Sequence, residues 1–119
     1  MFINVSNHPS SKWTSKQTQE ARKYGEIVDI PFPAVNPCCT DQEINSLVED
    51  YVNRVMAYDA PVVMVQGEFI FTYRLVSRLK KAGVKTVASQ SVRRTIEYID
   101  DNGNTLRQSE FEFVRFMEY

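Results

Sequence analysis

Apolar residues along this chain follow two patterns, short continuous runs and longer stretches in which they recur every three or four positions. A continuous run is typical of a strand buried on both faces, whereas the three-to-four spacing is typical of an amphipathic helix. The continuous runs predict strands over residues 2–5, 26–30, 61–65 and 84–88. One helical stretch separates each strand from the next, so the chain is expected to alternate strand and helix.

Capping signals define where the helices begin and end. Thr14 with Gln17, and Thr40 with Glu43, fit the capping box of a helix start, and Gly83 fits a helix stop. The first helix places one stripe on its inner side, formed by Trp13, Gln17, Ala21 and Tyr24. The third helix is expected to run from about position 69 to Gly83.

The last part of the chain predicts a β-hairpin. Residues 92–100 and 105–117 are rich in β-forming residues, and the Asp-Asn-Gly-Asn sequence at 101–104 is a strong turn signal. Residues 89–91, Ser-Gln-Ser, are expected to form a polar loop at the end of the fourth strand.

This order of elements predicts the fold class. Strands that alternate with helices imply a mainly parallel sheet with right-handed crossovers, to which the hairpin adds an antiparallel edge. A chain of 119 residues suits one domain and is too short for two ordinary ones. We therefore expect a single small three-layer α/β domain, Rossmann-like in the broad sense. It is not a dinucleotide-binding domain by motif, because no G-x-G-x-x-G follows the first strand and no Walker loop is present.

Composition indicates the localisation of the protein and the kinds of site it can carry. No apolar run approaches the roughly 20 residues that span a bilayer, and residues 1–5 lack a basic leader, so a cytoplasmic protein without membrane contact is expected. Cys38 and Cys39 are adjacent, which suits reduced loop thiols better than a disulfide. A single histidine excludes a histidine-rich metal site. Carboxylate-held Mg²⁺ stays open, although metal-independent chemistry without a cofactor is favoured.

Charge is unevenly distributed along the chain. The segment between Glu68 and Glu97 contains seven Lys and Arg residues and no acid, whereas the formal net charge of the whole chain is −1. Such a block either faces water as paired surface charge or forms a local basic surface for an anion such as a small polyphosphate. The net charge would argue against a general nucleic-acid binder only if charge were evenly spread, and duplex nucleic acid is not an expected partner.

Polar residues follow three of the predicted strands. The carboxyl ends of parallel strands meet at one edge of a sheet, where ligands bind in open α/β folds. The candidate site residues at this edge are Ser6, Asn7, His8, Gln66, Gly67, Glu68, Thr72, Ser89, Gln90, Arg93 and Arg94. Gly67 is expected to let the backbone turn sharply beside a ligand.

Three of these segments together resemble a known family. The first strand leads into Asn7-His8, the third leads into Gln66-Gly67-Glu68 with Thr72 in the next helix, and the chain closes on Phe-Val-Arg-Phe-Met-Glu-Tyr at 113–119. This pattern resembles the small standalone ring nucleases of type III CRISPR systems, which are similar to the CRISPR-associated Rossmann-fold (CARF) module. The likeness covers nearly the whole length, so residues 1–119 would form a single CARF-like domain.

The resemblance implies a function and a partner. It implies a homodimer that binds cyclic oligoadenylate, most often the four-membered ring, and cuts it, which switches off antiviral signalling. The chemistry implied is metal-independent attack of a ribose 2′-hydroxyl on the neighbouring phosphate. The alternatives are a protein that senses or sequesters the same ligand without cutting it, and an interaction subunit of a CRISPR-associated complex.

The candidate residues fit parts of that chemistry, and each has a structural alternative. His8 carries the side chain best suited to proton transfer near neutral pH, or it orders its own loop. Asn7 and Gln66 can read adenine edges or hold a phosphate oxygen, and Asn7 can equally cap a turn. Glu68 is a base, a group that binds a ribose hydroxyl, or a charge that stabilises the start of the helix.

Two further alternatives concern arginine and tryptophan side chains. Arg93 and Arg94 either contact phosphate or pair with Glu97, Glu110 or Glu112 across the hairpin. Trp13 either stacks on a base or packs the first helix.

Overall fold

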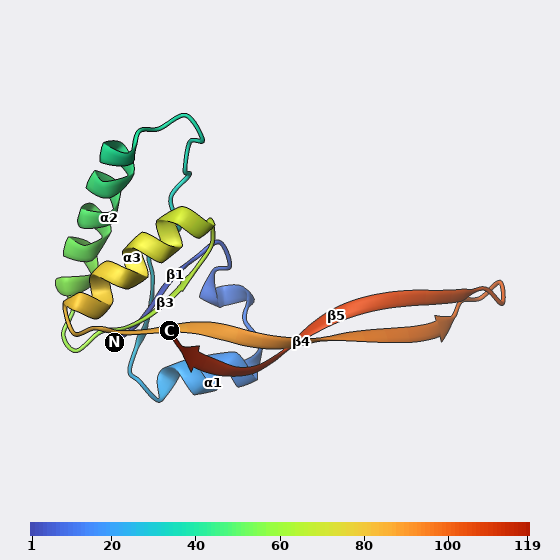
Figure 1. The fold of residues 1–119 in the computed structure, drawn as a ribbon. Helices are drawn as coiled ribbons and strands as arrows, with labels where there is room; N and C mark the ends of the chain where they lie inside the picture. Colours follow the sequence, from blue (N-terminus) through green and yellow to red (C-terminus); the bar gives the residue numbers. More distant parts are fainter.

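A five-stranded sheet runs through the molecule in the order β2-β1-β3-β4-β5 in the computed structural model, which describes residues 1–119 (Figure 1). Strands β1 to β4 are parallel, and β5 pairs antiparallel with β4. The strands are β1 Phe2–Ser6, β2 Ile27–Asp29, β3 Val62–Gln66, β4 Lys85–Ile99 and β5 Thr105–Glu118. The predicted α/β fold, with a mainly parallel sheet and a terminal hairpin, is confirmed.

Helices cover both faces of this sheet and make it the middle of three layers. Helices α2, Asp41–Met56, and α3, Phe69–Lys81, lie on one face, and the short helix α1, Ser15–Arg22, lies on the other (Figure 1). A 3-10 turn, Ser10–Lys12, precedes α1. Thr40 and Glu43 form the predicted capping box at the start of α2. None of these helices combines the length and the apolar character that a membrane crossing requires.

The core is divided by the sheet. Alternate side chains of β1 and β3 point to opposite faces, and nearly all of them are buried. Ile3, Val5, Val63 and Val65 pack against α2 and α3. The smaller core on the α1 side contains Phe2, Met64, Val87, Ala21 and Trp13, and the Trp13 ring meets Phe2 edge-on at 6.1 Å between centroids. Trp13 is therefore a packing residue.

The fourth strand differs from the prediction. Residues 89–91 were expected to form a loop, but β4 continues without a break to Ile99. The cause is a long-range pairing, because β5 runs back along the whole of β4 and holds Ser89 opposite Phe116. One β-bulge lies between Gln90 and Ser91, where Val114 is left without a residue opposite.

Beyond this bulge the two strands leave the body as a ribbon, here called the arm, residues 91–113 (Figure 1). Every residue of the arm is exposed except Asp100 and Phe113. The tip turns at residues 100–104, where the Asp100 carboxylate accepts hydrogen bonds from the backbone N–H groups of Asn102 and Asn104.

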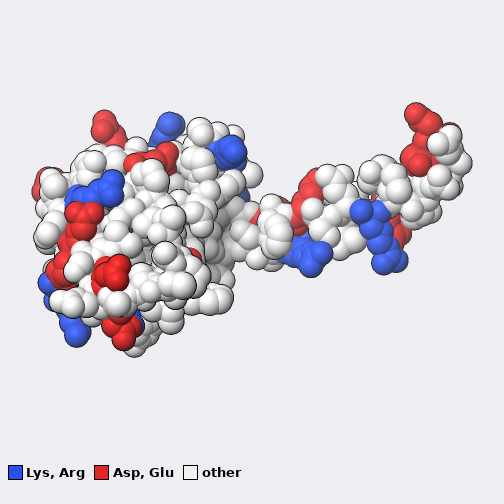
Figure 2. All heavy atoms as spheres, turned by 90° about the horizontal axis from the view of Figure 1, so that it is seen from above, with Lys and Arg blue, Asp and Glu red and all other residues white.

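The cations of the basic block do not gather into one surface. Arg74 and Arg78 of α3 pair with Asp41 and Glu49 of α2, and Arg94 pairs with Glu112 on the arm. Lysines and arginines alternate with acidic residues along the arm and over the visible face of the body (Figure 2). The block is therefore divided between α3 and β4, and three of its seven cations are paired with acids.

We predict that Tyr119→Phe lowers the free energy of unfolding by about 1 kcal/mol. The Tyr119 hydroxyl donates a 2.6 Å hydrogen bond to the Val65 carbonyl, and burial raises the pKa of this phenol, so the donor proton is retained at neutral pH. The contribution is lost only as the pH rises through that raised pKa. Urea denaturation measures the change. Tyr73→Phe, at a side chain that is 74% exposed, is the control and should change stability by less than about 0.5 kcal/mol.

A second prediction concerns Gly67, which follows β3. A Cβ at this position would overlap the side chain of Phe32, whose ring packs edge-on against Phe71. Gly67→Ala should therefore lower the free energy of unfolding by about 1–3 kcal/mol, because the Phe32 ring must move. In a Phe32→Leu background the cost should fall by at least about 0.5 kcal/mol. Equal losses in both backgrounds, measured by urea denaturation, would contradict the packing role.

Candidate functional site

A cleft of about 610 Å³ opens at the carboxyl edge of the sheet. The sheet order places β1 beside β3, and the chain leaves β1 toward β2 on one side and β3 toward β4 on the other. Loops that leave in opposite directions open a crevice between them, which is the usual ligand site of open α/β sheets. Residues of both loops line the cleft.

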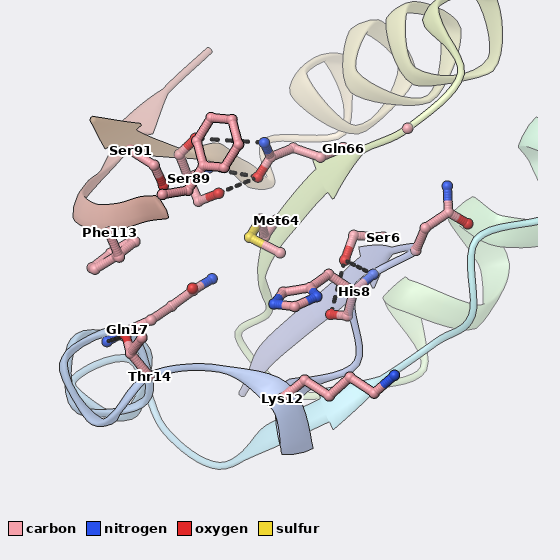
Figure 3. A pocket seen from close by; sticks show the side chains of 13 residues that line it. Ser6, His8, Lys12, Thr14, Gln17, Met64, Gln66, Ser89, Ser91 and Phe113 are labelled. Atoms are coloured by element: carbon pink, nitrogen blue, oxygen red, sulfur yellow. Dashed lines mark hydrogen bonds between the residues drawn. The ribbon is translucent and has the colours of Figure 1, made fainter. Parts of the chain in front are cut away.

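Three distant segments of the chain meet in this cleft, as the sequence predicted. Six of the predicted site residues line it: Ser6, Asn7, His8, Gln66, Gly67 and Ser89. Figure 3 shows His8 projecting from the loop after β1, opposite the pair formed by Gln66 and Ser89. The residues after β1 and β3 and the first part of the β4 extension therefore form one site.

The loop that carries His8 is fixed through its backbone. The His8 carbonyl accepts hydrogen bonds from the Asn4 amide at 2.9 Å and from the Trp13 indole at 3.1 Å, and the His8 N–H donates to the Ser6 hydroxyl at 3.1 Å. Asn4 also donates to Asp29 of β2, and its oxygen accepts from Ser6 at 2.6 Å. Sequence reasoning missed Asn4, although a lone amide inside an apolar strand is a visible signal.

The imidazole of His8 takes no part in this network. Every hydrogen bond that residue 8 makes uses its backbone, so an alanine there would keep them all. The ring is exposed and lines the cleft (Figure 3). Its position is thus set by the loop, while both of its nitrogens are free to meet a ligand.

Gln66 and Ser89 hold the wall of the cleft. The Gln66 amide oxygen accepts from both the N–H and the hydroxyl of Ser89 at 2.7 Å. Backbone pairing of β3 with β4 ends at Met64 and Val87, and this side-chain clamp joins the two strands two residues further along. Gln66 is therefore a positioning residue that fixes the point where β4 separates from β3.

Gln17 of α1 is the residue that sequence reasoning missed most clearly. Its side chain is only 8% exposed, points into the cleft (Figure 3), and makes no hydrogen bond of its own. The amide atoms themselves reach the solvent of the cleft, so they are available to a ligand. Gln17 stands on the inner stripe of α1, where a polar residue among apolar ones was the available signal.

The remaining lining gives the cleft its chemical character. Sequence reasoning did not place these residues in a site: Lys12, Thr14, Met64, Ser91, Phe111 and Phe113. No carboxylate lines the cleft, and Lys12 supplies a positive charge. Phe111 and Phe113 lie at the base of the arm, next to the body, so the base of the arm forms one wall of the cleft. The cleft combines amide and hydroxyl groups, one lysine and aromatic rings.

Two of the predicted residues serve the start of α3 instead. Both carboxylate oxygens of Glu68 accept backbone hydrogen bonds, one from Ile70 at 2.9 Å and the other from Phe71 at 2.7 Å. Glu68 is therefore the helix cap and does not line the cleft. Thr72 lies in the first turns of the same helix, and its hydroxyl is buried without a hydrogen bond, also outside the cleft.

The other three predicted residues lie outside the cleft on β4. Gln90 stands opposite Arg115 at the bulge and is exposed. Arg94 pairs with Glu112, and Arg93 donates to the Ser109 hydroxyl at 3.1 Å. These residues lie outside the cleft because β4 continues without a break. Residues that were expected in a loop beside the ligand instead lie further along the arm.

This arrangement suits recognition of a polar, anionic ligand with flat apolar groups. Amides and hydroxyls can bind base edges and sugar hydroxyls, the lysine can meet a phosphate, and the aromatic rings can stack. No group of three or more His, Cys, Asp or Glu side chains is placed to hold a metal ion. His8 is the side chain in the cleft best suited to move a proton.

Comparisons with known proteins identify the family of this chain. Searches among curated proteins and among solved structures returned no match. The model of one protein family matches residues 1–117, which is nearly the entire chain. The chain therefore belongs to the Uncharacterized protein MJ1673 family.

Proposed function

We propose that this protein is a ring nuclease, which binds cyclic oligoadenylate in the cleft at the carboxyl edge and cleaves it without a metal. The biological outcome would be the end of type III CRISPR signalling, as the resemblance of residues 7–8, of residues 66–68 with Thr72, and of residues 113–119 to small standalone ring nucleases implies. The observation that supports the proposal best is the lining itself. The stretch from His8 to Gln17 brings a free imidazole, a lysine and an unpaired amide into one carboxylate-free cleft, whose remaining lining comes from residues after β3 and from β4 and β5.

Each part of an adenylate unit has a counterpart in the cleft. An amide can bind the N6 and N7 edge of adenine through two hydrogen bonds, and Gln17 supplies an amide with both groups unpaired. Lys12 carries the charge that a phosphate requires. Phe111, exposed on the first part of the arm, offers a face on which a base can stack.

The reaction we propose is an internal transfer at one phosphodiester. The ribose 2′-oxygen attacks the adjacent phosphorus, the bond from phosphorus to the 5′-oxygen breaks, and a 2′,3′-cyclic phosphate and a free 5′-hydroxyl result. The 2′-hydroxyl loses one proton and the leaving 5′-oxygen gains one. His8 accepts the first proton or donates the second, and Asn7 orients the ribose or a phosphate oxygen.

The size of the cleft supports a homodimer for this function. A cyclic tetranucleotide is larger than a cleft of about 610 Å³, and the open carboxyl edge leaves part of it uncovered. The ligand has twofold symmetry, so two copies related by a twofold axis can each hold half of the ring.

We predict that the purified protein converts cyclic tetraadenylate to linear products in the presence of EDTA, and that His8→Ala lowers the turnover rate by about 100- to 10,000-fold. Binding should change little, because the backbone of residue 8 keeps its hydrogen bonds. Chromatography of the products measures turnover, and calorimetry measures binding.

Two lysines provide the matched control for this experiment. Lys12→Ala should weaken binding, whereas Lys16→Ala, four positions further along, should change neither binding nor turnover, because Lys16 is exposed and does not line the cleft. Intact ligand at stoichiometric wild-type protein, with binding retained, would replace the nuclease by a sequestering protein. Absence of binding would remove the nucleotide proposal.

A separate prediction concerns Gln17. Gln17→Met should weaken adenylate binding and reduce the preference for cyclic tetraadenylate over cyclic tetrainosinate, which lacks the N6 donor and which a paired amide disfavours by about 1–3 kcal/mol per base. The same variant should not lower the free energy of unfolding, because the amide makes no hydrogen bond in the free protein. A loss of more than about 1 kcal/mol in urea denaturation would instead make Gln17 a structural residue.

A further inference from the structure

The arm leaves the molecule with more surface than a chain of this size normally exposes. The accessible area is 7873 Å², whereas a compact monomer of 13.8 kDa is expected to expose about 6,600 Å². The radius of gyration is 17.3 Å, compared with about 13.5 Å for a compact domain of this length. No side-chain hydrogen bond or ion pair joins residues 92–112 to the body; those that this segment makes stay within the arm.

An isolated two-stranded ribbon is at best marginally stable in water, so the arm needs a surface to pack against. Its side chains indicate which kind of surface. Alternate positions share a face, and residues directly opposite in the two strands share it as well. Four exposed apolar residues consequently lie on one face of the arm, here called the apolar face: Val92, Ile96, Tyr98 and Leu106. The ion pair of Arg94 with Glu112 lies on the same face, between Val92 and Ile96.

A second uncovered apolar group lies on the body. Phe69, Ile70 and Tyr73 open helix α3, and Phe69 is 88% exposed. These three residues are called the α3 patch below. Neither Phe69 nor Tyr73 belongs to the buried core or to the residues packed against it. The α3 patch begins two residues after Gly67, which lines the cleft.

The arm and the α3 patch point away from the same edge of the sheet. Helix α3 begins where β3 ends, and β4, which runs parallel to β3, continues past that edge as the arm (Figure 1). The nine residues of β4 in the arm reach about 30 Å at the rise of an extended strand. When two copies face each other across this edge, the arm of each is long enough to pass along the body of the other.

Charge and area favour a second copy of this chain as the occupant. The arm carries five carboxylates and three arginines, which disfavours a nucleic acid or an anionic membrane surface. A twofold interface needs two complementary surfaces on one chain, and the arm and the α3 patch supply them. The excess area is of the order that each partner buries in a stable interface, about 800 Å².

We propose that two copies exchange arms, with the apolar face of each arm packed on the α3 patch of the other. The exchange supplies the interface of the homodimer that the proposed function requires. It also places a partner's arm beside each cleft. It does not depend on the identity of the ligand, so it can be correct even if no cyclic nucleotide binds.

Sedimentation velocity without ligand tests the exchange. The wild type should sediment as a dimer of twice 13.8 kDa. Ile96→Lys on the arm, and separately Phe69→Ser with Tyr73→Ser on the α3 patch, should each raise the dimer dissociation constant by at least about tenfold. Met56→Lys is the matched control, because Met56 is a similarly exposed apolar residue at the end of α2, far from the carboxyl edge, and this variant should remain dimeric.

A cross-linking experiment separates arm exchange from a simple loss of folding. In a Cys38→Ser, Cys39→Ser background, a Tyr98→Cys copy mixed with a Tyr73→Cys copy should form a disulfide-linked heterodimer under mild oxidation. A monomeric wild type would overturn the proposal and leave a different protein as the occupant. A dimer that dissociates with the arm variant and not with the α3 patch variant would also overturn it, as would the absence of the mixed disulfide.

Discussion

The buried amide of Asn4 is the group on which the geometry of the candidate site depends. It lies within β1, 1% exposed, between two apolar layers, where an unpaired amide would cost about 1–3 kcal/mol. Asp29, Ser6 and the His8 carbonyl satisfy its hydrogen bonds. The loop after β1 cannot move without leaving this amide unpaired. An exposed histidine is thereby held in place by groups in the interior, while its own ring stays free.

The edge formed by β4 and β5 links the body, the cleft and the arm. The Gln66 side chain clamps Ser89 where the β3–β4 ladder ends, and β5 keeps β4 extended from that point onward. One strand therefore belongs to the core at Val87, to the cleft wall at Ser89 and to the projecting arm beyond Ser91. Ligand binding and packing of the arm would share this strand, which gives them a physical route of coupling.

Local patterns predicted the layers and most elements of this fold, because apolar spacing and helix caps such as that at Thr40 act over a few residues. The extension of β4 through Ser89 could not be predicted in this way, since residues about 25 positions later hold it open. Glu68 was placed in the site by its position after a strand, but the nearby helix start takes both its oxygens. Gln17 was visible as a polar residue on an apolar stripe.

The bulge at the base of the arm limits how the length of this protein can change. Phe113 and Phe116 are three positions apart, yet their rings lie 4.9 Å from each other, because the unpaired Val114 brings both to one side of the sheet. A single insertion or deletion at this base would turn the arm over and exchange its two faces. Insertions or deletions at the tip that add or remove residues in pairs, equally on both strands, keep each side chain on the same face of the arm. Related chains can therefore differ in the reach of the arm and still present the same face.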